Sequence, residues 1–151
     1  MTIKGFAACV AAAGMVISFP AAAGGMGQSE KIRRLDIMLM VTGLRCRNTA
    51  DNFNREYGRF TTNHLGELNA AARDLKAQYS VQYGPGRASD KALDKLSVQM
   101  ANQYGQGHPW LSCGQLKHVA GTLADMRGMQ PLVEAANDLL DDGAHQMAWL
   151  R

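Results

Sequence analysis

The sequence has few of the residues on which most catalytic motifs depend. Its 151 residues include three cysteines, four prolines and 7% aromatic residues. It contains no Gly-x-Ser-x-Gly element that would present a serine nucleophile, and no Gly-Lys-Ser/Thr loop that would cradle a phosphate. These absences favour a non-catalytic protein, and we expect no cofactor.

The four histidines do not stand in a metal-binding pattern either. His64, His108, His118 and His145 are widely separated, and none has another His, Cys, Asp or Glu at the spacing of a zinc or iron motif. Methionine sulfur suits copper(I), but methionine on helical faces more often fills a core. We therefore expect no metal. Because His64 lies on an apolar stripe, it is predicted to be a hydrogen-bonded core histidine.

Charge of one sign is not in excess. The net charge is +3, and +2 without Lys4, which is too near neutral to indicate a nucleic-acid partner. Basic residues nevertheless crowd the first third of the chain, and acidic residues gather near its end. Two interpretations remain open: a basic patch for an acidic partner, or two ends of the chain that neutralise each other. The second is the more ordinary one.

Only one long apolar run is present, and it lies at the start. Lys4 precedes an uncharged, largely apolar stretch at 5–19, which Pro20 and three alanines follow. This order is typical of a secretory signal peptide over 1–23, leaving a single domain over 24–151. The run falls short of the roughly 20 residues that span a bilayer. We expect a periplasmic or secreted protein with no membrane span in the mature chain.

Removal of the signal peptide would discard Cys9 and leave two cysteines. An even number of cysteines in an oxidising compartment predicts one disulfide, between Cys46 and Cys113. It would close a loop of about 67 residues, for which loop entropy suggests about 4 kcal/mol of stabilisation. Two free buried thiols are the alternative.

Helical periodicity accounts for the rest of the chain. Apolar residues recur every three or four positions, and no useful strand-like alternation appears. The predicted helices cover residues 30–47, 50–80, 89–104 and 114–127, with a fifth that starts near 131. The sequence thus predicts an all-α fold, an antiparallel bundle of about five helices. The first helix is apolar around most of its circumference and should be central. Ser89 is predicted to cap the third helix.

The loop at 105–113 is the most distinctive candidate site. Its glycines allow close approach, Pro109 stiffens it, and Gln106, His108 and Trp110 are candidate binding residues. The alternative is structural: Trp110 packs over the end of the bundle and His108 satisfies a carbonyl group. We expect a non-catalytic binding or interaction module for an unknown protein or small ligand of the cell envelope. A small envelope hydrolase with His108 as general base, or a chaperone-like structural protein, are the alternatives.

Two segments, at 35–47 and 100–113, carry a resemblance to known proteins. They read LDIMLMVTGLRCR and MANQYGQGHPWLSC, and both resemble a group of uncharacterised small exported helical bacterial proteins. Some of that group are labelled S-adenosyl-L-homocysteine hydrolase. The present sequence departs from that enzyme, because it lacks the Gly-x-Gly-x-x-Gly element that would bind NAD. About 128 mature residues are also too few for two domains. The resemblance implies an exported helical protein and no particular activity.

Overall fold

The computed structural model describes residues 27–140, which form six α-helices and no strand. The helices are α1 (Gln28–Cys46), α2 (Asn54–Asn63), α3 (Leu65–Tyr83), α4 (Arg87–Tyr104), α5 (Cys113–Asp125) and α6 (Gln130–Leu140). The all-α prediction is confirmed. The predicted signal peptide, His145 and the residues after 140 lie outside the described part. None of the six helices is long and apolar enough to cross a membrane.

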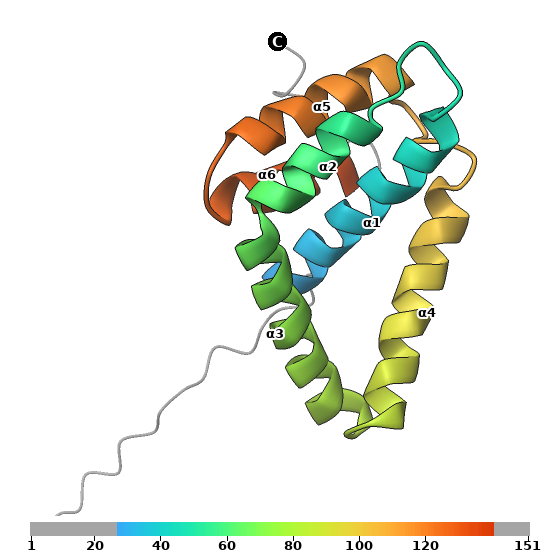
Figure 1. Ribbon diagram of the computed structural model, residues 1–151. Helices are drawn as coiled ribbons and strands as arrows, with labels where there is room; N and C mark the ends of the chain where they lie inside the picture. The colour runs from blue at the N-terminus through green and yellow to red at the C-terminus, as the bar shows by residue number, and fades with distance from the viewer. Residues whose placement is uncertain (1–26, 141–151) are drawn as a thin grey trace, which may run out of the picture.

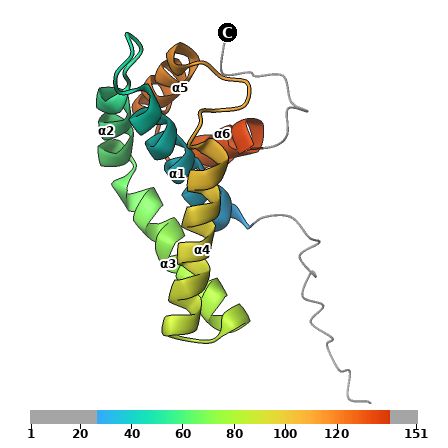
Figure 2. The same ribbon diagram turned by 90° about the vertical axis from the view of Figure 1, so that its right-hand side faces the viewer.

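Helix α1 is the centre of the molecule, as its apolar circumference predicts. It packs against each of the other five helices. Ile32, Leu35 and Leu39 are almost completely buried along it. Figure 1 shows α2, α5 and α6 on one side of α1 and the hairpin of α3 and α4 extending away from them. The view in Figure 2 shows the same separation from a perpendicular direction.

The predicted single helix over 50–80 is wrong, because the chain bends at His64. Helix α2 ends at Asn63 and α3 begins at Leu65. His64 between them has φ −110° and ψ 19°, outside the helical range. The two halves pack on different partners: α2 lies mainly on α5, whereas α3 lies on α1 and α4. One straight helix could not make both sets of contacts.

The predicted disulfide is present and joins two helix ends. Cys46 is the last residue of α1 and Cys113 the first of α5, with their Cα atoms 5.8 Å apart. The start of α5 is further fixed by a capping box. The Ser112 hydroxyl accepts the backbone N–H of Gln115, and the Gln115 side chain accepts the backbone N–H of Ser112. This end of the molecule is therefore held by covalent and polar contacts together.

Two predicted helix starts have different outcomes. Pro131 lies in the first turn of α6, as expected from its fixed φ and missing N–H. The predicted cap at Ser89 is wrong. Helix α4 begins at Arg87, and the Ser89 hydroxyl donates to the carbonyl of Gly86 instead of accepting a backbone N–H. Gly86 has φ +67°, a conformation that glycine adopts without strain, and it occupies the N-cap position three residues before Ser89.

Candidate functional site

The loop that carries the predicted binding residues packs against the bundle. His108 is 8% exposed, and its Nε2 lies 3.0 Å from the carbonyl oxygen of Leu139. Its ring stacks on Tyr104 and meets Trp110 edge-on, with ring centroids 5.4 and 4.6 Å apart. Trp110 is half-buried against the core, whereas Gln106 is exposed. The structure thus brings His108 and Trp110 together in an aromatic cluster and leaves Gln106 apart from it.

The described residues around His108 offer little for acid–base chemistry. Burial lowers its pKa, and the hydrogen bond with the Leu139 carbonyl only partly opposes this. Among residues 27–140, no carboxylate or hydroxyl group forms a hydrogen bond with either ring nitrogen. A binding role for this loop remains a prediction.

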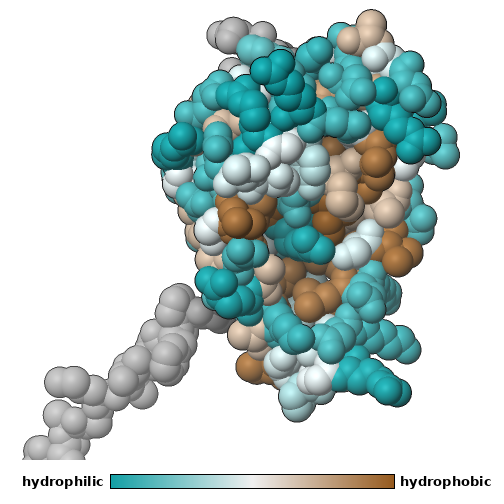
Figure 3. All heavy atoms as spheres, in the orientation of Figure 1, coloured by the Kyte–Doolittle hydropathy of each residue, from teal (hydrophilic) through white to brown (hydrophobic). Residues whose placement is uncertain are grey.

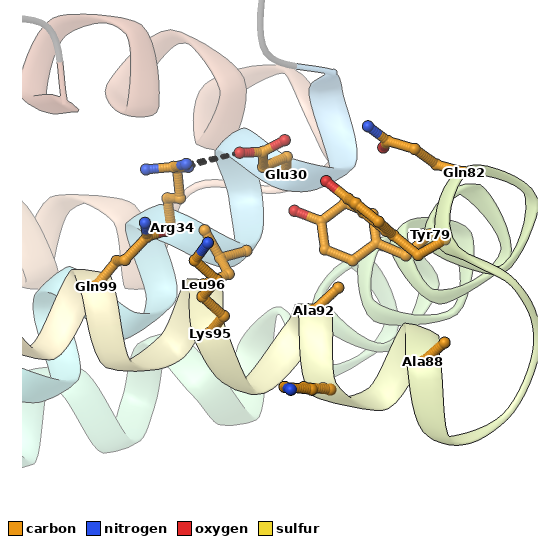
Figure 4. A pocket seen from close by; sticks show the side chains of 11 residues that line it. Glu30, Arg34, Tyr79, Gln82, Ala88, Ala92, Lys95, Leu96 and Gln99 are labelled. Carbon is orange, nitrogen blue, oxygen red and sulfur yellow. Dashed lines mark hydrogen bonds and ion pairs between the residues drawn. The ribbon is translucent and has the colours of Figure 1, made fainter.

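A groove elsewhere has more of the features of a ligand site. It has a volume of about 510 Å³ and lies between the start of α1 and the α3–α4 hairpin. Helix α1 contributes Glu30 and Arg34, α3 contributes Tyr79, and α4 contributes Lys91 and Lys95. Figure 4 shows side chains from the three helices surrounding one open space. We call it the α1–α3–α4 groove.

Positive charge is in excess in this groove. Arg34 and Glu30 neutralise each other through a 2.7 Å ion pair along one side of α1. Arg34 also directs Nη1 toward the sulfur of Met100, 3.5 Å away. Lys91 and Lys95 are exposed, and within the described chain neither forms an ion pair or a side-chain hydrogen bond. Two ammonium groups, four residues apart on α4, are therefore uncompensated.

Two tyrosines form the wall opposite the lysines. Tyr79 and Tyr83 stand four residues apart on α3 and meet edge-to-face, with centroids 5.3 Å apart. Desolvation raises the pKa of the Tyr79 phenol above its ordinary value of 10.0, and the negative charge of Glu30 adds to the effect. The phenol therefore stays protonated at neutral pH and can donate a hydrogen bond to an anion.

The remainder of the lining is small, neutral or apolar. Gln82 and Gln99 supply amide groups, and Ala92 and Leu96 supply apolar surface. A groove of this volume lies within the range usual for small-molecule sites, which combine apolar surface with a few polar groups. The arrangement can hold an anionic group beside the lysines and an apolar group beside the tyrosines.

Among residues 27–140, basic side chains in the first third of the chain are only partly neutralised from its far end. Arg59 forms an ion pair with Asp125, whereas Lys31 donates a hydrogen bond to the neutral side chain of Asn137. Arg33 and Arg34 instead pair with acidic residues of their own helix. On the face seen in Figure 3, apolar residues lie among hydrophilic ones toward the middle, and the upper and lower parts of that face are mostly hydrophilic.

The groove could not be found from the sequence, because its residues have ordinary spacing within each single helix. Tyr79 has the helical spacing of an apolar stripe, with Leu75 four residues before it, and the lysines on α4 have the spacing of any solvated helix face. The one available signal was the repeated spacing of four, in Tyr79 with Tyr83 and in Lys91 with Lys95, which puts each pair on one face. Across residues 27–140, no three His, Cys, Asp or Glu side chains gather closely enough to hold a metal ion.

Comparison of the chain with protein-family models, with curated proteins and with solved structures finds no match.

Proposed function

We propose that the chain is an exported, non-catalytic binding module that holds a small anionic molecule in the α1–α3–α4 groove. The observation that carries this proposal is the pair of uncompensated ammonium groups, Lys91 and Lys95, opposite two tyrosines in a cavity of about 510 Å³. An anionic ligand would gain charge-assisted hydrogen bonds there, which are about twice as strong as neutral ones. Its apolar part would lie along Tyr79 and Leu96.

Export is supported by two independent features of the chain. The stretch at 1–23 has the order of a signal peptide, and the Cys46–Cys113 disulfide forms most readily in an oxidising compartment. The exported chain is expected to begin at Gly24. N-terminal sequencing and mass analysis of protein from the periplasm or medium would test this, and a chain that stays in the cytosol with free thiols would contradict it.

Binding can be tested with phenyl phosphate, which joins an anionic group to an aromatic ring. Titration followed by ¹H–¹⁵N NMR should give saturable shifts at the amides of Tyr79, Ala92 and Lys95. The Lys91→Gln/Lys95→Gln variant should bind about tenfold or more weakly, since it loses two charge-assisted contacts. Added salt should weaken binding to the unaltered protein, because the lysines are exposed to solvent.

The matched control is Lys117→Gln, a lysine of α5 that does not line the groove. It should bind phenyl phosphate as the unaltered protein does. Absence of saturable shifts at the groove, or equal affinity in the double variant and the control, would overturn the proposal.

A further inference from the structure

A second, smaller cavity lies among α1, α2 and α3. Its volume is about 230 Å³, and none of its lining residues belongs to the α1–α3–α4 groove. Helix α1 contributes Arg33 and Asp36, α2 contributes Tyr57, and α3 contributes Leu68 and Asn69. The two cavities share α1 and α3, and each of these helices contributes different residues to the two linings.

The polar side of this cavity is a fixed array in which charge is balanced. Tyr57 donates its hydroxyl proton to Asp36 Oδ1 at 2.9 Å, and Arg33 donates from Nη1 to Oδ2 at 3.2 Å. Arg33 and Asp36 are the only formally charged residues of the lining, and they neutralise each other. A net charge on a ligand therefore has no uncompensated partner here.

Hydrogen-bonding capacity nevertheless remains in this array. Each oxygen of the Asp36 carboxylate accepts one of these two hydrogen bonds and can accept another, and Arg33 retains further N–H donors. The Asn69 side chain forms no hydrogen bond to any described residue and supplies both a donor and an acceptor. The polar lining of the cavity thus offers both donors and acceptors.

The other side of the cavity is apolar. Ile32, Leu65, Leu68 and Ala72 line it. Leu65 is 58% exposed, although it is a large apolar side chain next to a polar array. An occupant that covered Leu65 with C–H groups would remove this apolar surface from water.

We propose that this cavity is a second binding site, for a neutral, ring-shaped polyhydroxylated molecule such as a pyranose sugar. Such a ring has C–H groups that fit against Leu65 and Leu68. Its hydroxyls each donate and accept, which matches Asp36, Arg33 and Asn69. The Asp36 carboxylate would repel an anionic ligand, and the Arg33 guanidinium would repel a cationic one. The site therefore favours a neutral ligand. The inference does not depend on the proposed function of the other groove.

The test uses methyl β-D-glucopyranoside, methyl α-D-mannopyranoside and methyl β-D-galactopyranoside as probes, with ¹H–¹⁵N NMR of the full chain as the measurement. At least one of them should give saturable shifts of the Asn69 side-chain amide and the Ala72 backbone amide. A dissociation constant of about 1 mM is the expected scale for so small a cavity. Glucuronate should bind more weakly than the matching neutral sugar.

Two variants and a control connect binding to the array. Asn69→Ala, which alters an exposed residue, should weaken binding about threefold to tenfold through the loss of one or two hydrogen bonds. Tyr57→Phe should also weaken it, because Asp36 loses the donor that positions its carboxylate. Asn102→Ala, an exposed asparagine of α4, should leave binding unchanged. The proposal is overturned if no sugar gives saturable shifts, if both variants bind like the control, or if glucuronate binds best.

Discussion

His64 Nε2 donates a hydrogen bond to the carbonyl oxygen of Leu123, with 2.8 Å between the two atoms. A carbonyl only accepts, so the proton of the buried ring lies on Nε2. Beside it, Asn63 Nδ2 donates to the carbonyl of Ala124 at 2.8 Å. The junction of α2 and α3 is therefore tied to the last turn of α5 by two hydrogen bonds, one of them to a carbonyl that also accepts the backbone N–H of Met126.

The first prediction concerns this junction. His64→Leu keeps a similar volume but removes one of the two donors to the Leu123 carbonyl, which keeps the backbone N–H of Met126. We expect a loss of about 0.5–1.5 kcal/mol in the free energy of unfolding, measured by urea denaturation. His118→Leu, at an exposed histidine of α5, should change it by no more than about 0.5 kcal/mol. Equal stability of the two variants would show that the hydrogen bond does not hold the junction.

A second prediction concerns the Cys46–Cys113 disulfide, whose cysteines are 67 residues apart in sequence. The Cys46→Ser/Cys113→Ser variant should lose about 4 kcal/mol of unfolding free energy, because its unfolded chain is less constrained. Urea denaturation with and without reductant measures this. Reductant should destabilise the unaltered protein and have no effect on the variant. An effect of the same size on both would contradict the assignment.

The third prediction is a pH dependence caused by His108. Burial lowers its pKa below the ordinary value of 6.5, so the unfolded chain takes up the proton first as the pH falls. The stabilisation from neutral His108 is therefore complete above about pH 6.5 and is lost as the pH falls through the lowered pKa. Unfolding free energies measured between about pH 7 and 5 should fall less in His108→Gln than in the unaltered protein. The control, His118→Gln, should show the full fall.

A fourth prediction contrasts two glycines. Gly58 lies inside α2, and a Cβ built on it meets nothing within 4 Å. Gly58→Ala should therefore stabilise the protein by about 1 kcal/mol, the difference in helix propensity. Gly128 is equally uncrowded but has φ +84°, so Gly128→Ala should cost roughly 1–2 kcal/mol. Thermal unfolding of both variants measures the difference, and a shift in the same direction for both would be against the prediction.

Most of the fold could be predicted because it depends on local pattern and on two cysteines. The apolar circumference of α1 indicated its central place, and Pro131 indicated the start of α6. The break at His64 could not be predicted in this way. The helical spacing continues through the bend at Phe60, His64 and Leu68, so the periodicity gives no sign of the bend. At the bend, His64 forms a hydrogen bond to Leu123, 59 residues away in sequence, and periodicity carries no information on a contact at that distance.

The candidate sites could not be predicted from the sequence, for a related reason. Arg34, Tyr79 and Lys95 lie on three helices, and only the angle of the α3–α4 hairpin brings them to one groove. In the second cavity, Asp36 and Tyr57 meet because α2 turns away from α3 at the same bend. By contrast, His108 and Trp110 are only two residues apart in sequence and are easily noticed there, and the structure gives them packing contacts.

The two ends of the molecule differ in how they are held together, because the disulfide lies at one end and the α3–α4 turn at the other. The end at Cys46 and Cys113 is cross-linked, whereas the turn at 84–86 is held mainly by α3, α4 and their contacts with α1. Amide protons near this turn should therefore exchange with solvent through local opening that leaves the cross-linked end closed. The α1–α3–α4 groove lies on the side where this local opening is expected. A ligand bound there would stabilise the contact between the hairpin and the central helix.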